Sequence, residues 1–128
     1  MRLAGLAVAL AAAAPALAQT AAEPPDWANL AECSAVFGVV VEAGAPPPDD
    51  IRADQALRAA RAFRDRAVAV AAEAGQADPE GDVASIMDYL VPRWQNRATR
   101  LTSVPSNLRW FRFCGTLGRR YGVLPLPD

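Results

Sequence analysis

Residues 107–121, with the sequence NLRWFRFCGTLGRRY, form the clearest amphipathic pattern in the chain. Apolar side chains recur there at three- and four-residue spacings, which places them on one face of a helix: Trp110, Cys114, Leu117 and Tyr121. The other side is basic and polar: Arg109, Arg112, Thr116, Arg119 and Arg120. This stretch therefore predicts a helix that buries one face, with Cys114 in the middle of that face.

The second cysteine has the same setting in residues 27–43. One face of this predicted helix is apolar: Leu30, Cys33, Phe37, Val40 and Val41. The opposite face carries small residues that permit close approach of another helix: Ala28, Ala31, Ala35 and Gly38. We expect a central helix, packed on more than one side, with Asp26 as its N-cap and Gly44 as its stop.

The first eighteen residues have the layout of a cleaved export signal. Met1 and Arg2 precede an apolar run over 3–14, and small residues at Ala16 and Ala18 follow Pro15. The run is too short to cross a bilayer of about 30 Å, and no later stretch is a better candidate. We expect a periplasmic or secreted protein without a transmembrane segment in the mature chain. Residues 19–128 form a single helical domain in this interpretation, with extended tails at 19–26 and 122–128.

In an oxidising compartment, one pair of cysteines indicates one structural disulfide. Cys33 and Cys114 both lie on apolar faces, so both sulfurs are expected to point at the core. The alternative is two unpaired buried thiols. A disulfide would join an early helix to a late one.

Two further helices complete the prediction. Residues 51–74 carry a stripe of small side chains, with Asp49 or Asp50 as the cap: Ala53, Ala56, Ala60, Phe63, Ala67, Val70 and Ala74. On the outer face of that helix we expect solvated arginines: Arg58, Arg61 and Arg64. A third helix begins after Asp78 and buries Val83, Met87, Leu90, Trp94 and Leu101. Pro92 falls on its polar side, where it either bends the helix or splits it in two. The fold class is all-α: a four-helix bundle whose first and last helices are joined by one disulfide.

Histidine is absent from the chain, which removes the commonest metal ligand and the usual acid/base catalyst at neutral pH. We expect no metal and no cofactor. An enzyme would have to rely on carboxylates, and Glu32 and Asp88 project away from the apolar faces of their helices. The chain is therefore predicted not to be an enzyme. The alternative is a carboxylate-dependent hydrolase that acts on an envelope component.

Charge is distributed unevenly along the chain. Residues 19–88 hold thirteen acids and five arginines, whereas residues 89–128 hold seven arginines and one acid. One interpretation is internal pairing of the acidic front half with the basic back half. The other is a binding face on the basic half.

The residues of that expected binding face come from the third and fourth helices: Tyr89, Arg93, Asn96, Arg97, Arg100, Arg109 and Arg112. Guanidinium groups beside an aromatic and an amide suit an anionic envelope ligand or an acidic protein surface. Nucleic acid is disfavoured as a partner because the protein is expected to be exported and its net charge is −1. Binding to a membrane surface would need the apolar face of the fourth helix, which a disulfide would commit to the core. We predict a small interaction or inhibitor-type binding module.

Overall fold

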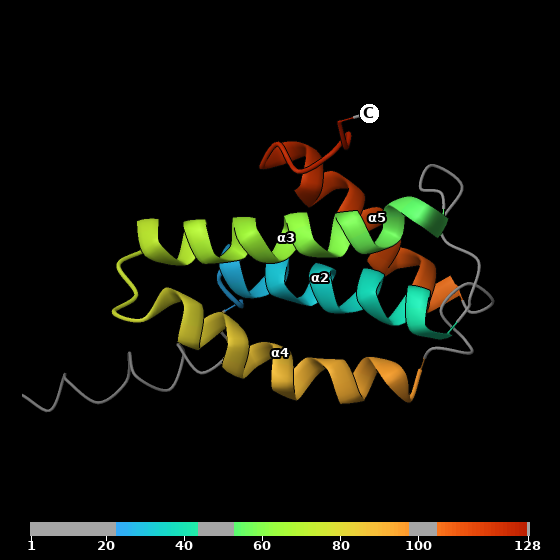
Figure 1. The fold of residues 1–128 in the computed structure, drawn as a ribbon, viewed down its shortest axis with the longest axis horizontal. Coiled ribbons are helices and arrows are strands. Elements are labelled where there is room, and N and C mark those ends of the chain that lie inside the picture. Colours follow the sequence, from blue (N-terminus) through green and yellow to red (C-terminus); the bar gives the residue numbers. More distant parts are fainter. Residues whose placement is uncertain (1–22, 44–52, 98–104, 128) are drawn as a thin grey trace, which may run out of the picture.

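The computed structural model describes residues 23–43, 53–97 and 105–127, and these form four helices without a strand. In chain order the helices are α2 (Asp26–Ala43), α3 (Ala53–Glu73), α4 (Pro79–Gln95) and α5 (Pro105–Arg120) (Figure 1). The predicted four-helix bundle is confirmed. None of the described helices combines the length and the apolar character that a bilayer span requires.

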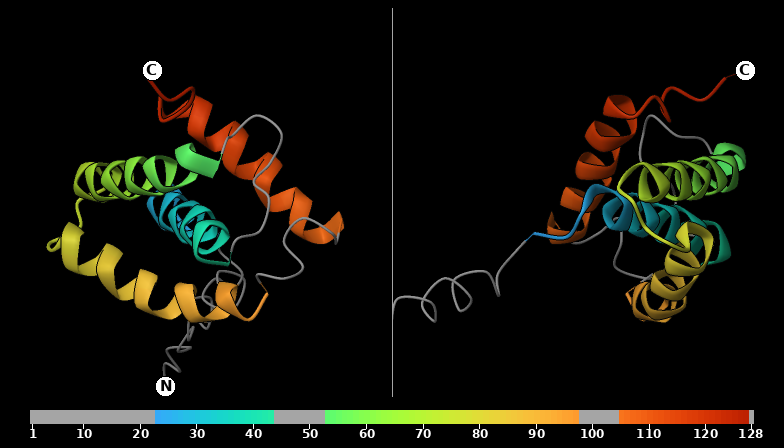
Figure 2. Two further views of the ribbon diagram at one scale, coloured as in Figure 1. Left: turned by 45° about the vertical axis from the view of Figure 1, so that its right-hand side comes forward. Right: turned by 90° about the vertical axis from the view of Figure 1, so that its left-hand side faces the viewer.

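Helix α2 lies at the centre of the bundle, with the other three helices around it (Figure 2). Both of its predicted faces are buried: Leu30, Cys33 and Phe37 on one, Ala28, Ala31 and Ala35 on the other. The prediction of a helix packed on several sides is therefore confirmed. The predicted N-cap is wrong, because the helix begins at Asp26 itself, and the backbone N–H groups of Ala28 and Asn29 bond to the carbonyl of Pro25. The side chains of Val40 and Val41 lie outside the described part, as do residues 44–52.

Helix α3 packs on α2 through small side chains, as the alanine stripe predicted. Within the stripe the buried residues are Ala56, Ala60, Phe63, Ala67 and Val70, and Ala59 and Ala71 are buried beside them. Ala74 is exposed, contrary to the prediction, because the helix ends at Glu73 and Gly75 turns the chain with a φ of 84°. Arg58, Arg61 and Arg64 are exposed as expected.

Helix α4 starts as its sequence predicts. The carboxylate of Asp78 accepts a hydrogen bond of 3.1 Å from the backbone N–H of Gly81, and Pro79 is the first helical residue. Val83, Leu90 and Trp94 are buried and Met87 is partly buried. The helix runs through Pro92 to Gln95, so the alternative in which this proline splits it is wrong. Pro92 is exposed, and Leu101 lies outside the described residues.

Helix α5 is attached to α2 by the Cys33–Cys114 disulfide, which spans 81 positions of sequence with 5.6 Å between the two Cα atoms. The predicted pairing is confirmed, and the arginines of α5 lie on its exposed side. Phe111 falls outside the apolar stripe that the spacing predicts for this helix. It is nevertheless buried, because its ring packs against Phe37 with 6.0 Å between centroids, whereas Phe113 is exposed.

The chain after α5 folds back onto the core. Gly122 adopts a φ of 72°, which allows the backbone N–H groups of Val123 and Leu124 to bond to the carbonyl of Gly118. Val123 is buried, and the Tyr121 hydroxyl donates a hydrogen bond to the carboxylate of Asp26. That bond raises the pKa of Tyr121, because the hydroxyl must keep its proton to donate. The guanidinium of Arg58 also donates a hydrogen bond to the Pro127 carbonyl. The described part of the predicted tail at 122–128 is therefore held against the bundle.

Candidate functional site

The predicted binding residues on α4 begin with a paired tyrosine and arginine. Tyr89 is 62% exposed, and the Arg93 guanidinium lies 5.0 Å from the centroid of its ring. Arg93 Nη1 also donates a hydrogen bond of 2.8 Å to the tyrosine hydroxyl. The two side chains are one turn apart, so the helix itself brings them together. This pair holds a guanidinium in place at the protein surface.

Two residues after the end of α4, the guanidinium of Arg97 lies 5.1 Å from the centroid of the Trp94 ring. Trp94 is 2% exposed and is therefore a fixed platform for this cation. Its indole Nε1 donates a hydrogen bond of 3.1 Å to Glu32 of α2. Arg93 of α4 and Arg97 just after it thus each lie over an aromatic ring.

Glu32 is partly buried in this arrangement, which corrects the expectation that its carboxylate projects away from the packed faces. Burial raises the pKa of Glu32 above its ordinary value of 4.5. The hydrogen bond from Trp94 and the positive charges of Arg93 and Arg97 act in the opposite direction. Asp88, the other carboxylate considered from the sequence, is exposed as expected.

Aromatic rings connect α4 to α5. Trp94 meets Trp110 edge to face with 5.3 Å between ring centroids, and Trp110 meets Phe113 in the same way at 5.6 Å. Phe113 is 41% exposed, so this row of rings runs from the core to the surface. We call the whole surface the arginine–aromatic face: Tyr89, Arg93, Trp94, Arg97, Trp110 and Phe113.

The structure brings together only some of the predicted binding residues. Tyr89, Arg93 and Arg97 lie on the arginine–aromatic face, and Asn96 is exposed at the end of α4, where its backbone N–H bonds to the Pro92 carbonyl. Arg109 and Arg112 are exposed on α5, on either side of Trp110 in sequence, and Arg100 lies outside the described residues. The sequence pattern places Trp110 in the apolar stripe of its helix, and neither Trp110 nor Phe113 was among the predicted binding residues. The signal for them was the alternation of basic and aromatic residues in 109–113.

Salt bridges do not account for the arginines of this face. In the described part of the chain the salt bridge recorded is between Arg120 of α5 and Asp26 of α2, at 3.7 Å. That contact joins the basic back half to the acidic front half, as internal pairing predicts. Arg93 and Arg97 form no salt bridge with any described residue. Each lies over an aromatic ring, and both attract the Glu32 carboxylate over a longer distance.

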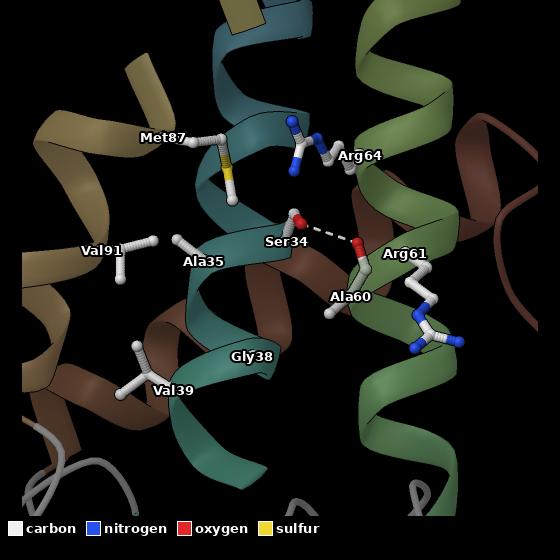
Figure 3. A pocket seen from close by; sticks show the side chains of 9 residues that line it. All are labelled: Ser34, Ala35, Gly38, Val39, Ala60, Arg61, Arg64, Met87 and Val91. Carbon is white, nitrogen blue, oxygen red and sulfur yellow. Dashed lines mark hydrogen bonds between the residues drawn. The ribbon is translucent and has the colours of Figure 1, made fainter. Parts of the chain in front are cut away.

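A pocket of about 190 Å³ lies elsewhere, between α2, α3 and α4 (Figure 3). Glu32 is not among its lining residues, so the carboxylate with the raised pKa and the pocket are separate features. Within residues 23–43, 53–97 and 105–127, no three histidine, cysteine, aspartate or glutamate side chains gather as a metal site.

Comparison with known proteins adds no relative: no family model, curated protein or solved structure matches the chain.

Proposed function

We propose that this protein is an exported, non-enzymatic binding module whose arginine–aromatic face docks on an acidic surface of a partner protein. The proposal depends on the contacts that the guanidinium groups of Arg93 and Arg97 make. Each guanidinium lies over a ring and forms no salt bridge with a described carboxylate, although both charges act on Glu32 over a longer distance. A guanidinium that meets a ring with its face keeps edge N–H groups for oxygen acceptors, although one of those of Arg93 already donates to the Tyr89 hydroxyl.

The aromatic surroundings favour protein recognition in particular. Tryptophan, tyrosine and arginine dominate the binding energy of protein interfaces, where rigid rings contribute large contact areas. Tyr89 and Phe113 are the large exposed aromatic residues of the described part, and both belong to this face. Their rings are held by neighbours, which lowers the entropy lost on binding. An acidic protein surface supplies both the carboxylates and the apolar area that such a face requires.

The hydrolase alternative has one supporting observation, the raised pKa of Glu32. Its Oε1 already accepts the indole N–H of Trp94, and the pocket between α2, α3 and α4 does not include it. A general acid needs a substrate position within hydrogen-bond reach. We therefore prefer the binding proposal to this alternative.

The test compares two double variants of equal charge. Arg93→Gln with Arg97→Gln removes the stacked arginines, whereas Arg61→Gln with Arg119→Gln removes two exposed arginines outside the face. Each protein is immobilised and exposed to envelope extract, the captured proteins are identified by mass spectrometry, and their affinity is then measured with purified partner at low and high salt. Melting temperature is recorded for every variant.

We expect the first double variant to lose at least about tenfold in affinity at low salt, with a smaller loss at high salt, because charge attraction is screened. Its stability should change by only about 0 to 1 kcal/mol, as for other exposed charges. The control variant should bind like the wild type. Equal losses in both double variants, or a lowered melting temperature with unchanged affinity, would contradict the proposal. Failure of the wild-type protein to capture any protein from the extract would contradict the proposal as well.

A further inference from the structure

The pocket between α2, α3 and α4 lies away from the arginine–aromatic face. Its α4 residues are Met87 and Val91, one turn apart, whereas Tyr89 and Arg93 follow the same spacing two residues later in the helix. Two residues along a helix turn a side chain to nearly the opposite side. The pocket and the binding face are therefore independent features of the same helix.

The pocket exists because small residues line α2 and α3 there. Ala35, Gly38 and Ala60 leave space that Met87 and Val91 of α4 do not fill (Figure 3). A Cβ atom placed on Gly38 would lie 4.0 Å from the Cβ of Ala60, which is an ordinary contact distance. The backbone thus tolerates a side chain at this position, and the space is available to a ligand.

Apart from Ser34 and the two arginines Arg61 and Arg64, the residues that line the pocket are apolar. Its hydroxyl group, on Ser34, donates a hydrogen bond of 2.6 Å to the carbonyl of Ala60 and has no further proton to offer. An apolar cavity of about 150 Å³ is large enough for a benzene ring. The present volume of about 190 Å³ suits a ring or a short branched chain.

An arginine supplies the polar end of the site. The side chain of Arg64 extends from α3 across α2, and its guanidinium lies on the side of Ser34 and Met87 (Figure 3). Arg61, one turn earlier, also lines the pocket, but its guanidinium points away from Met87 (Figure 3). Arg64 is exposed and forms no hydrogen bond or salt bridge with a described residue. A carboxylate at the mouth of the pocket could accept two hydrogen bonds from such a guanidinium.

We propose that this pocket binds a small carboxylic acid with an apolar body about the size of a benzene ring. The ring occupies the space beside Gly38 and Met87, and the carboxylate pairs with Arg64. This inference does not rest on the proposed protein partner, because the two sites share no residue.

Met87 provides a direct reporter of binding. It is one of two methionines in the chain, the other being Met1, so methyl-labelled methionine gives at most two NMR signals, and Met87→Leu assigns them. The probes are 3-phenylpropionate, its neutral amide and acetate, titrated at constant salt. We expect a saturable shift of the Met87 methyl signal with 3-phenylpropionate, at a Kd on the order of 1 mM for a ligand of this size. The amide should bind more weakly and acetate should produce no saturable shift.

Three variants then test the assignment. Gly38→Leu should fill the pocket and abolish the shift. Arg64→Gln should weaken the binding of 3-phenylpropionate at least about fivefold and leave the binding of the amide unchanged. Arg61→Gln should bind both probes as the wild type does. No saturable shift with the acid would overturn the proposal. It would equally be overturned if Gly38→Leu bound normally, if Arg61→Gln and Arg64→Gln had the same effect, or if the amide bound as tightly as the acid.

Discussion

Helices α3 and α5 are attached to the central helix α2 in different ways. Helix α3 lies against α2 along small side chains, with Ser34 bonded to the Ala60 carbonyl and the rings of Phe37 and Phe63 stacked at 5.5 Å. Helix α5 crosses α2 obliquely and is held at a few points, chiefly the disulfide and the ring of Phe111 (Figure 1). Small residues thus allow a long, close contact between α2 and α3, with one pair of large rings within it. Helix α5 has only a short contact with α2, and this contact depends on the disulfide and on the ring of Phe111.

The largest expected effect follows from removing that covalent bond. Cys33→Ala with Cys114→Ala opens a loop of 81 positions, which should cost about 4.5 kcal/mol of stability on the chain-entropy model. We expect the loss to appear in urea unfolding as a lower midpoint. Hydrogen exchange should show α5 losing protection before α2 and α3 do.

A matched control for this variant is the reduced wild-type protein. It keeps both sulfur atoms, so it separates the missing cross-link from the smaller side chains of the alanine variant. Uniform loss of protection across all four helices would contradict the distinction between α3 and α5.

The distinction could be predicted from the sequence in part. Both cysteines lie within apolar stripes of period 3.6, so their burial and pairing followed from local spacing. The burial of Phe111 did not follow, because it is offset from the stripe of α5 and is covered only through contact with Phe37, far away in the chain. Local periodicity records which face of a helix is apolar. It does not record how much of the adjoining surface a neighbouring helix covers.

Two glycines differ in how closely their neighbours pack around them. Gly38 of α2 has room for a Cβ, whereas a Cβ on Gly118 of α5 would lie 2.9 Å from both Phe63 Cζ and Leu124 Cδ1. Gly118→Ala should therefore cost roughly 1 to 2 kcal/mol, since overpacking exceeds the gain in helix propensity. Gly38→Ala should stabilise the protein by up to about 1 kcal/mol. Urea unfolding of both variants measures the two effects, and equal stabilisation would show that α5 packs loosely at Gly118.

The contacts of the candidate site are also of two kinds: some lie within one helix, and others join residues that are far apart in the sequence. The Tyr89–Arg93 pair lies one turn apart on one helix, so the sequence predicted it directly. The contact between Trp94 and Glu32 joins residues 62 positions apart, and the contact between Trp94 and Trp110 joins two helices. Neither follows from the pattern of a single helix. The sequence therefore indicated the basic half of the face but not the buried tryptophan platform or the partly buried carboxylate beneath it.

The smallest expected effect concerns Glu32, where α2 meets α4. Burial raises the pKa of this carboxyl group, so folding favours its protonated form. The resulting stabilisation is fully present below its ordinary value of 4.5 and is lost as the pH rises through the higher folded-state pKa. Glu32→Gln keeps an oxygen that accepts the Trp94 N–H but carries no charge at any pH.

We therefore expect Glu32→Gln to stabilise the protein at pH 7 by less than about 1 kcal/mol, because the neutral amide avoids the cost of burying a charge. Its advantage should shrink as the pH falls toward 4, where the wild-type carboxyl group becomes protonated. Asp88→Asn is the control, since Asp88 is an exposed carboxylate on α4 and should show no such pH-dependent gain. Melting temperatures of the three proteins between pH 4 and pH 7 provide the measurement. A variant that is less stable than the wild type at pH 7 would show that attraction to Arg93 and Arg97 outweighs burial, and that the α2–α4 contact depends on charge.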